Sequence, residues 1–119
     1  MSVGSHGMDH VPWRRLGWSA IDREIAEAKQ VLEDTLRAAV ETAACPFGAY
    51  DRRTLRKLRD AGFKGVYTGD RGWARSQDWL VSRNTVCRWD SADSVKRIVS
   101  GSPHTTLARE GKRWIEQRL

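Results

Sequence analysis

A stripe of apolar residues at helical spacing runs through residues 21–36 and limits the folds open to this chain. It comprises Ile21, Ile25, Ala28, Leu32 and Leu36, with charged residues largely on the other sides. Ser19, with Asp22 three residues later, has the pattern of a capping box. The spacing therefore predicts an amphipathic helix over residues 19–36, whose apolar side must lie on another surface, most simply a sheet.

Strand and helix signals alternate after this helix. Residues 40–45 have the pattern of a buried strand that ends at the turn Pro46-Phe47-Gly48. Asp51 is expected to cap a helix over about 52–61, which Gly62 closes. The remaining expected elements are a strand at 63–68, a polar loop at 69–78, short strands at 80–81 and 85–89, a helix at 92–100 capped by Ser91, and a helical stretch at 104–119.

This alternation predicts an α/β fold with a parallel sheet. Only two of the strands are convincing, and a parallel sheet needs cover on both faces. We therefore expect residues 1–119 to form a single partial domain, either as part of a larger α/β architecture or paired with another copy. Residues 102–119 would be its helical tail.

The chain length and composition exclude several classes of protein. With 119 residues, 39% of them hydrophobic and 30% charged, the chain is expected to be neither disordered nor a membrane protein. It contains no apolar run of roughly 18 residues, the length that spans a membrane. No signal peptide is visible, so a cytoplasmic location is expected. Cys45 and Cys87 make no disulfide framework, which suits a reducing compartment.

A net charge of +6 indicates an alternative function, the binding of nucleic acid or another anionic polymer. Five cations gather on the predicted helix at 52–61: Arg52, Arg53, Arg56, Lys57 and Arg59. A simpler interpretation is a solvated helix face. The six tryptophans are expected mainly to fill the core, and otherwise to stack on sugars in a cleft.

Two histidines near the start are candidate metal ligands. His6 and His10 are four residues apart, so their imidazoles can converge on one ion if the backbone between them turns. Catalytic zinc takes three protein ligands and a water, so a third ligand would have to come from elsewhere. The alternative is a flexible segment with two ordinary histidines.

The turn at Pro46-Phe47-Gly48 is a candidate ligand-binding segment. It follows a predicted parallel strand, and α/β folds bind their ligands at the carboxyl ends of such strands. The alternative is an ordinary connection from a strand to a helix that Asp51 caps.

Taken together, these segments resemble the NodB-like polysaccharide deacetylase family over about residues 4–90. The matching segments are Gly4-Ser5-His6-Gly7-Met8-Asp9-His10, the helix at 19–36, Ala44-Cys45-Pro46-Phe47-Gly48-Ala49-Tyr50-Asp51, residues 55–68 and residues 79–84. The resemblance implies a distorted β/α barrel, here a partial one. It also implies hydrolysis of acetyl groups on carbohydrate with a divalent metal, expected to be zinc.

The resemblance further implies roles for particular residues. His6 and His10 would be metal ligands, and Pro46, Phe47 and Gly48 would lie beside the acetylated carbohydrate, with a backbone group of Phe47 at the oxyanion. The family's paired aspartates would precede residue 1, and Ala44 stands where the family often has arginine. The catalytic residues therefore remain unassigned. We expect a truncated chain with little activity alone, completed by a missing N-terminal half or by self-association.

Overall fold

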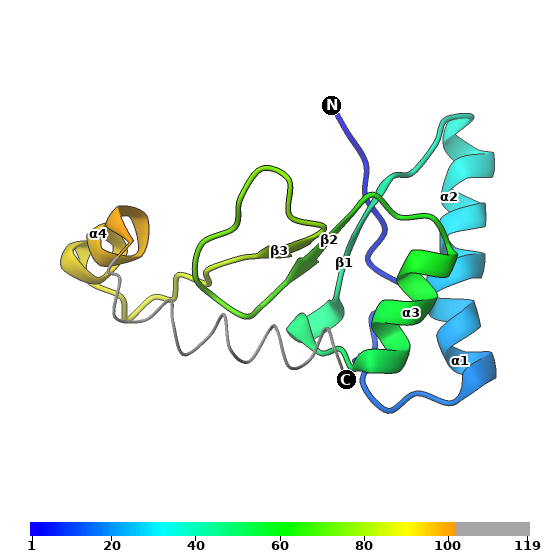
Figure 1. The fold of residues 1–119 in the computed structure, drawn as a ribbon, viewed down its shortest axis with the longest axis horizontal. Coiled ribbons are helices and arrows are strands. Elements are labelled where there is room, and N and C mark those ends of the chain that lie inside the picture. The colour runs from blue at the N-terminus through cyan, green and yellow to red at the C-terminus, as the bar shows by residue number, and fades with distance from the viewer. Residues whose placement is uncertain (102–119) are drawn as a thin grey trace.

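The computed structural model describes residues 1–101 (Figure 1). The elements are α1 (Trp18–Asp22), the π-helical turn η1 (Arg23–Glu27), α2 (Ala28–Leu36), β1 (Thr42–Ala44), the 3-10 turn η2 (Pro46–Gly48), α3 (Arg52–Asp60), β2 (Gly65–Thr68), β3 (Leu80–Ser82) and α4 (Ala92–Ser100). The helical stretch expected at 104–119 lies outside the described residues.

The sheet has three parallel strands in the order β1-β2-β3. In its register Ala43 lies opposite Val66, and Val66 lies opposite Leu80. The α/β class and the parallel sheet are therefore confirmed. Parallel neighbours need a crossover connection, which α3 provides between β1 and β2, whereas a loop without a helix connects β2 to β3.

The N-terminal segment adds a bridge at the edge of this sheet. Ser5 pairs in parallel with Ala43: the Ser5 N–H donates to the carbonyl of Thr42, and the Ala44 N–H donates to the carbonyl of Ser5, both over 2.8 Å. The N-terminal segment is therefore anchored beside β1 at Ser5. This anchor brings the following residue, His6, to the carboxyl end of β1.

The helix expected at 19–36 is present, with a π-helical turn inside it, and its apolar stripe packs as predicted up to Ala28, whereas Leu36 at its end is 42% exposed. The helices α1, α2 and α3 lie together beside β1, as Figure 1 shows, and Ile21, Ile25 and Ala28 are buried. The core they share also includes Trp13, Val40, Ala43, Leu55, Leu58, Phe63, Val66 and Leu80. The strand Gly65–Thr68 and the helix α3, capped by Asp51, also match the expectation.

The capping box expected at Ser19 is wrong. The helix already begins at Trp18, because Gly17 is the N-cap residue and its carbonyl accepts from Ile21 N–H over 3.0 Å. Ser19 therefore lies within the first turn. In contrast, Ser91 caps α4 as predicted, since its hydroxyl accepts from the Ser94 N–H over 3.1 Å.

The strand expected at 85–89 is also wrong. This segment is irregular and ends in a turn that Asp90 holds. The Asp90 carboxylate accepts from the Cys87 N–H over 2.6 Å, and the Asp90 N–H donates to the Cys87 carbonyl over 2.9 Å. These local bonds use backbone groups that a strand would direct at a neighbour, so β-forming side chains alone do not make a strand here.

Most tryptophans in residues 1–101 do not fill the core. Only Trp13 is fully buried among those in residues 1–101, and Trp79 is partly buried. Trp18, Trp73 and Trp89 are 55%, 54% and 77% exposed. The expectation of core filling is therefore wrong for these three. Cations cover two of them, because Arg53 lies over the Trp18 ring and Arg88 over the Trp89 ring.

Candidate metal and substrate site

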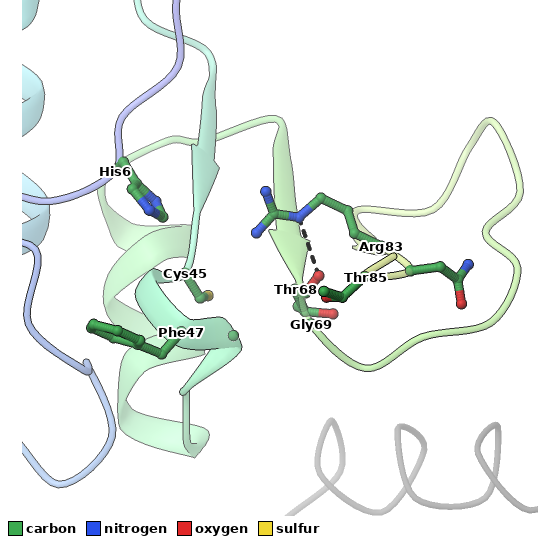
Figure 2. Close-up of a pocket in the computed structure, with 9 residues that line it drawn as sticks. His6, Cys45, Phe47, Thr68, Gly69, Arg83 and Thr85 are labelled. Atoms are coloured by element: carbon green, nitrogen blue, oxygen red, sulfur yellow. Dashed lines mark hydrogen bonds between the residues drawn. The ribbon is translucent and has the colours of Figure 1, made fainter. Parts of the chain in front are cut away.

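A cavity of about 410 Å³ opens at the carboxyl ends of all three strands (Figure 2). Cys45 directly follows β1, Thr68 ends β2, and Arg83 directly follows β3. This is the edge at which parallel α/β sheets bind their ligands. The lining residues are His6, Cys45, Phe47, Gly48, Thr68, Gly69, Arg83, Asn84 and Thr85.

His6 enters this cavity in a fixed tautomer. Its Nδ1 lies 2.7 Å from the carbonyl oxygen of Ala44. A carbonyl oxygen only accepts hydrogen bonds, so Nδ1 carries the proton and Nε2 presents a lone pair. Metal-binding histidines are commonly oriented in this way, with the second ring nitrogen donating to a carbonyl.

His10 faces His6 from the same loop. The Nε2 atoms of the two rings are 3.1 Å apart, and their centroids are 4.7 Å apart. His10 itself has a left-handed backbone conformation, with a φ of 54°. Two nitrogens that bind one tetrahedral zinc at about 2.0–2.1 Å lie about 3.3 Å apart. The two exposed imidazoles thus stand close to the separation that a shared ion requires.

A third ligand is not found in the part of the chain that the structure describes. Residues 1–101 contain no group of three or more His, Cys, Asp or Glu side chains that could hold a metal ion. Asp9, next to His10, is engaged elsewhere, because both its oxygens accept from the Arg23 guanidinium over 3.1 and 3.2 Å. The pair of imidazoles fits a divalent ion, and further ligands would have to complete the site.

The turn η2 presents Phe47 at the rim of the cavity. Phe47 has a φ of 55° and is 71% exposed, and its ring centroid lies 4.8 Å from that of His10. Gly48 follows with a φ of 64°, and a Cβ there would lie 2.8 Å from backbone atoms of Gly69. Pro46 is buried and supports the turn from inside. The structure thus brings Phe47 and Gly48 to the cavity beside His6 and His10, while Pro46 lies beneath.

Cys45 contributes a thiol to the cavity but not a nucleophile. Burial raises the pKa of Cys45 to about 12, and Asp70 adds to this effect, while Arg83 opposes it. The reactive form of cysteine is the thiolate, which is scarce at neutral pH when the pKa is this high.

Arg83 is a site residue that the sequence interpretation missed. Its Nε donates to the carbonyl of Thr68 over 3.2 Å, and its guanidinium points toward the β1 side of the cavity in Figure 2. Within residues 1–101 it has no ion-pair partner. The sequence contained a signal for it, because Arg83 follows a short strand expected at 80–81. Parallel α/β folds bind ligands at the carboxyl ends of their strands, and this rule applies to Arg83 as it does to the turn after β1.

Comparison with known proteins decides the family. The sequence pattern described as polysaccharide deacetylase matches residues 1–66, more than half of the chain. The chain belongs to the polysaccharide deacetylase family. The matched range includes both candidate ligand histidines and the turn η2, so the resemblance seen in the sequence is confirmed. No curated protein sequence matches the chain.

Solved structures of polysaccharide deacetylases share this fold. The Streptococcus pyogenes deacetylase PplD, solved in complex with acetate, superimposes with a TM-score of 0.68 at 18% identity, covering 80% of this chain and 43% of that one. A polysaccharide deacetylase from Bacillus cereus gives a TM-score of 0.65 at 16% identity, covering 82% of this chain and 32% of that one. The chain thus spans less than half the length of these deacetylases, so the fold is a partial deacetylase domain.

The basic helix α3 uses several of its cations within the molecule. Arg53 lies over the Trp18 ring at 4.7 Å, and Arg59 over the Trp79 ring at 4.1 Å. Lys57 donates to Asp22 over 2.6 Å. These contacts favour a packed, partly solvated face over a phosphate-binding one. No helix within residues 1–101 has the length and apolar character to cross a membrane.

Proposed function

We propose that this chain carries the ligand histidines of a metal-dependent hydrolase for acetyl groups on carbohydrate. One observation supports this most: the facing Nε2 atoms of His6 and His10, 3.1 Å apart, beside the Phe47 turn at the carboxyl end of the sheet. His6 and His10 would hold a divalent cation, with zinc expected. Bound there, such a cation supplies Lewis-acid chemistry, in that it acidifies water and polarises a carbonyl.

The turn η2 offers a donor for the acetyl oxygen. Gly48 N–H donates to the Cys45 carbonyl and Ala49 N–H to that of Pro46, both over 3.0 Å. Phe47 N–H has no acceptor among residues 1–101. We assign it to the oxyanion that forms when water attacks the acetyl carbonyl, since backbone N–H groups commonly stabilise such charge. The exposed Phe47 ring would lie against the sugar.

The guanidinium of Arg83 could stabilise a negative charge in the cavity, either on the oxyanion that forms during the reaction or on the carboxylate product. Its Nε is held by the Thr68 carbonyl, which leaves the terminal N–H groups for a ligand in the cavity. Arginine binds carboxylates with such paired donors. The S. pyogenes deacetylase was solved with acetate, and acetate is the product that this proposal expects here.

A general base is not provided by the described residues. No carboxylate lines the cavity within residues 1–101, and the Cys45 thiol is protonated. We therefore expect little or no acetate release from acetylated oligosaccharides by the chain alone. A carboxylate brought to this cavity by another polypeptide segment or by a second copy of the chain would be expected to restore turnover.

Metal binding tests the proposal directly. Isothermal titration with Zn²⁺, Co²⁺ and Ni²⁺ would compare the wild type with His6→Ala and His10→Ala, with His104→Ala, at the third histidine of the sequence, as the control. We expect one ion per chain, lost in both site variants and kept in the control. A wild type that binds none of the three ions, or site variants that bind as the wild type does, would contradict the proposal.

A further inference from the structure

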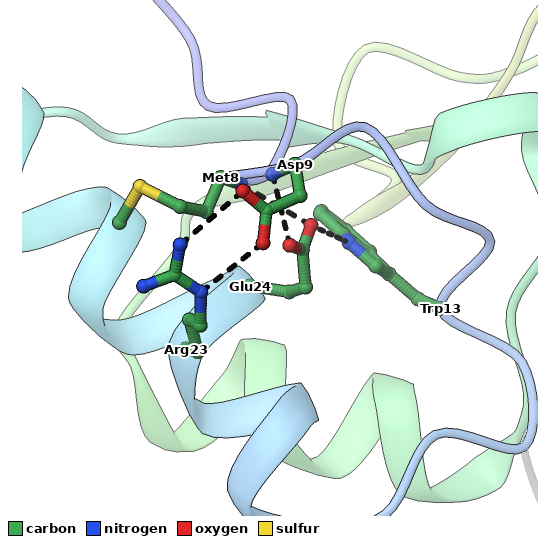
Figure 3. Close-up of polar contacts among 5 residues, drawn as sticks. All are labelled: Met8, Asp9, Trp13, Arg23 and Glu24. Atoms are coloured by element: carbon green, nitrogen blue, oxygen red, sulfur yellow. Dashed lines mark hydrogen bonds and ion pairs between the residues drawn. The ribbon is translucent and has the colours of Figure 1, made fainter.

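A buried carboxylate lies under the loop that joins the two candidate ligands. Glu24, on the π-helical turn η1, is only 2% exposed (Figure 3). Its place in the apolar stripe, three residues after Ile21 and four before Ala28, puts it on the side of the helix that faces the core. A carboxylate on such a face needs hydrogen-bond donors.

All the donors to Glu24 come from the residues around His10. Oε1 accepts from the Asp9 N–H over 2.9 Å. Oε2 accepts from the Met8 N–H and from the Trp13 indole N–H, each over 3.2 Å. Figure 3 shows these bonds converging on one carboxylate. The bonded residues bracket His10 on both sides, so Glu24 holds the segment on which the His10 ring stands.

The surroundings make this support rigid. Trp13 is fully buried, and its carbonyl accepts from the hydroxyl of Thr54 on α3 over 3.1 Å. Gly7 has a φ of 88°, and a Cβ there would lie 2.3 Å from Glu24 Oε2. Only glycine therefore lets the chain between the two histidines pass this close to the carboxylate.

The neighbouring ion pair does not provide the same support. Asp9 and Arg23 meet at 3.1 Å, but both side chains are about half exposed. Exposed pairs of this kind contribute little, and salt screens them. The buried bonds to Glu24 therefore carry most of the restraint on the loop.

We propose that Glu24 is a positioning residue that keeps the His10 imidazole facing that of His6, and so sets the affinity of this pair for a divalent cation. The cation-binding part rests on the proposed function, whereas the ring geometry can be measured without metal. Groups that orient ligands in this way typically change metal affinity by 10–100-fold when mutated.

The test compares Glu24→Gln with Glu33→Gln. Glu33 is the matched control, because it lies further along the same helix, in α2, and also accepts a backbone N–H, that of Val40, over 2.8 Å. Circular dichroism verifies folding. Zn²⁺ affinity is then measured by titration. The cross-peak between the carbon-bound ring protons of His6 and His10 is recorded in metal-free protein.

We expect Glu24→Gln to bind Zn²⁺ about 10–100-fold more weakly and to lose the inter-ring cross-peak. Glu33→Gln should bind within about twofold of the wild type and keep the cross-peak. A folded Glu24→Gln with unchanged affinity and an unchanged cross-peak would overturn the inference. If the wild type binds no Zn²⁺ but its cross-peak depends on Glu24, the proposed function fails and the positioning role stands.

Trp13→Phe keeps the test decisive if Glu24→Gln does not fold. This change removes one donor to Oε2 and leaves the carboxylate and the bulk of the ring. We expect a weaker cross-peak and a several-fold loss of Zn²⁺ affinity, smaller than for Glu24→Gln. Unchanged values for both in folded Trp13→Phe would overturn the inference.

Discussion

The Nδ1 atom of His6 donates to the carbonyl of Ala44 over 2.7 Å, so a residue of β1 determines which nitrogen of a candidate ligand is free. The free nitrogen, Nε2, lies 3.1 Å from Nε2 of His10. Two lone pairs cannot bond to each other, so when both rings are neutral in the metal-free protein, His10 is the donor at that contact. The two histidines therefore need opposite tautomers.

The first prediction concerns these tautomers. In neutral, metal-free protein, long-range ¹H–¹⁵N spectra should show His6 protonated at Nδ1 and His10 protonated at Nε2. Adding Zn²⁺ should change the tautomer of His10, because Nε2 must lose its proton to bind a metal, while His6 stays unchanged. Finding the same tautomer for both rings without metal would contradict the arrangement.

The second prediction concerns the turn beside the histidines. Gly48→Ala should destabilise the protein, because its positive φ strains any side chain and the new Cβ would meet the Gly69 backbone at 2.8 Å. Gly62→Ala is the control, since it has a φ of 78° but nothing within 4 Å of the added atom. In urea unfolding, Gly62→Ala should cost about 1–2 kcal/mol and Gly48→Ala clearly more. Equal costs would argue against the close approach of Gly48 to Gly69.

The third prediction compares the two cysteines. Burial raises the pKa of Cys45 to about 12, so only about one thiol in ten thousand is ionised at pH 8. Cys87 is partly exposed. Iodoacetamide at pH 8 should label Cys87 in the folded protein and Cys45 only after denaturation, as mass spectrometry would show. Rapid labelling of native Cys45 is the outcome that excludes this description of the cavity.

The fourth prediction concerns the cap of α3. Burial tends to raise the pKa of Asp51, but hydrogen bonds from the Arg15 N–H, from the N–H and hydroxyl of Thr54 and from the Arg53 N–H outweigh it and leave the pKa lowered. A lowered pKa in the folded state stabilises the protein above the unfolded pKa, and this contribution is lost as pH falls through the folded value.

Asp51→Ala should therefore cost about 1–2 kcal/mol at pH 7. The difference in unfolding free energy between wild type and Asp51→Ala should shrink as the pH falls below about 4, near the ordinary aspartate pKa. Urea unfolding of both proteins between pH 7 and pH 3 measures this difference. A gap that stays constant over the whole range would show that the charge of Asp51 plays no part.

The fifth prediction concerns Arg83. Acetate added to the protein should shift the amide signals of Thr68 and Gly69, which line the cavity with Arg83. Arg83→Gln should weaken acetate binding at least about fivefold, equivalent to about 1 kcal/mol. Arg88→Gln serves as the control, because Arg88 lies over the Trp89 ring and does not line the cavity. Equal acetate binding by both variants would remove Arg83 from the site.

Local sequence patterns predicted the helices well. The burial of Ile21, Ile25 and Ala28 follows from their spacing alone, and Asp51 and Ser91 cap helices because their side chains bond to N–H groups three residues away. Exposed tryptophans were predicted poorly. The partners of Trp18, Arg53 and Lys57, lie 35 or more residues away in the sequence, and composition does not reveal them.

The convergence of His6 and His10 could not be derived from their spacing. Four residues can follow many backbone paths, and the observed path depends on two contacts that are distant in sequence. One is the bridge between Ser5 and Ala43, and the other is the bonding of the loop to Glu24. Family resemblance suggested the result, but only the tertiary contacts explain why the rings meet.

The π-helical turn has a consequence for comparing this chain with related sequences. Such a turn holds one residue more than an α-helical turn, so the wider turn absorbs the extra residue and the flanking helical segments keep their facing. Deleting a single residue within this turn is therefore expected to leave a regular α-helix, with Ile21 and Ala28 still directed at the core. In an alignment with related chains, a gap of one residue at this turn would be compatible with the same packing of the helix.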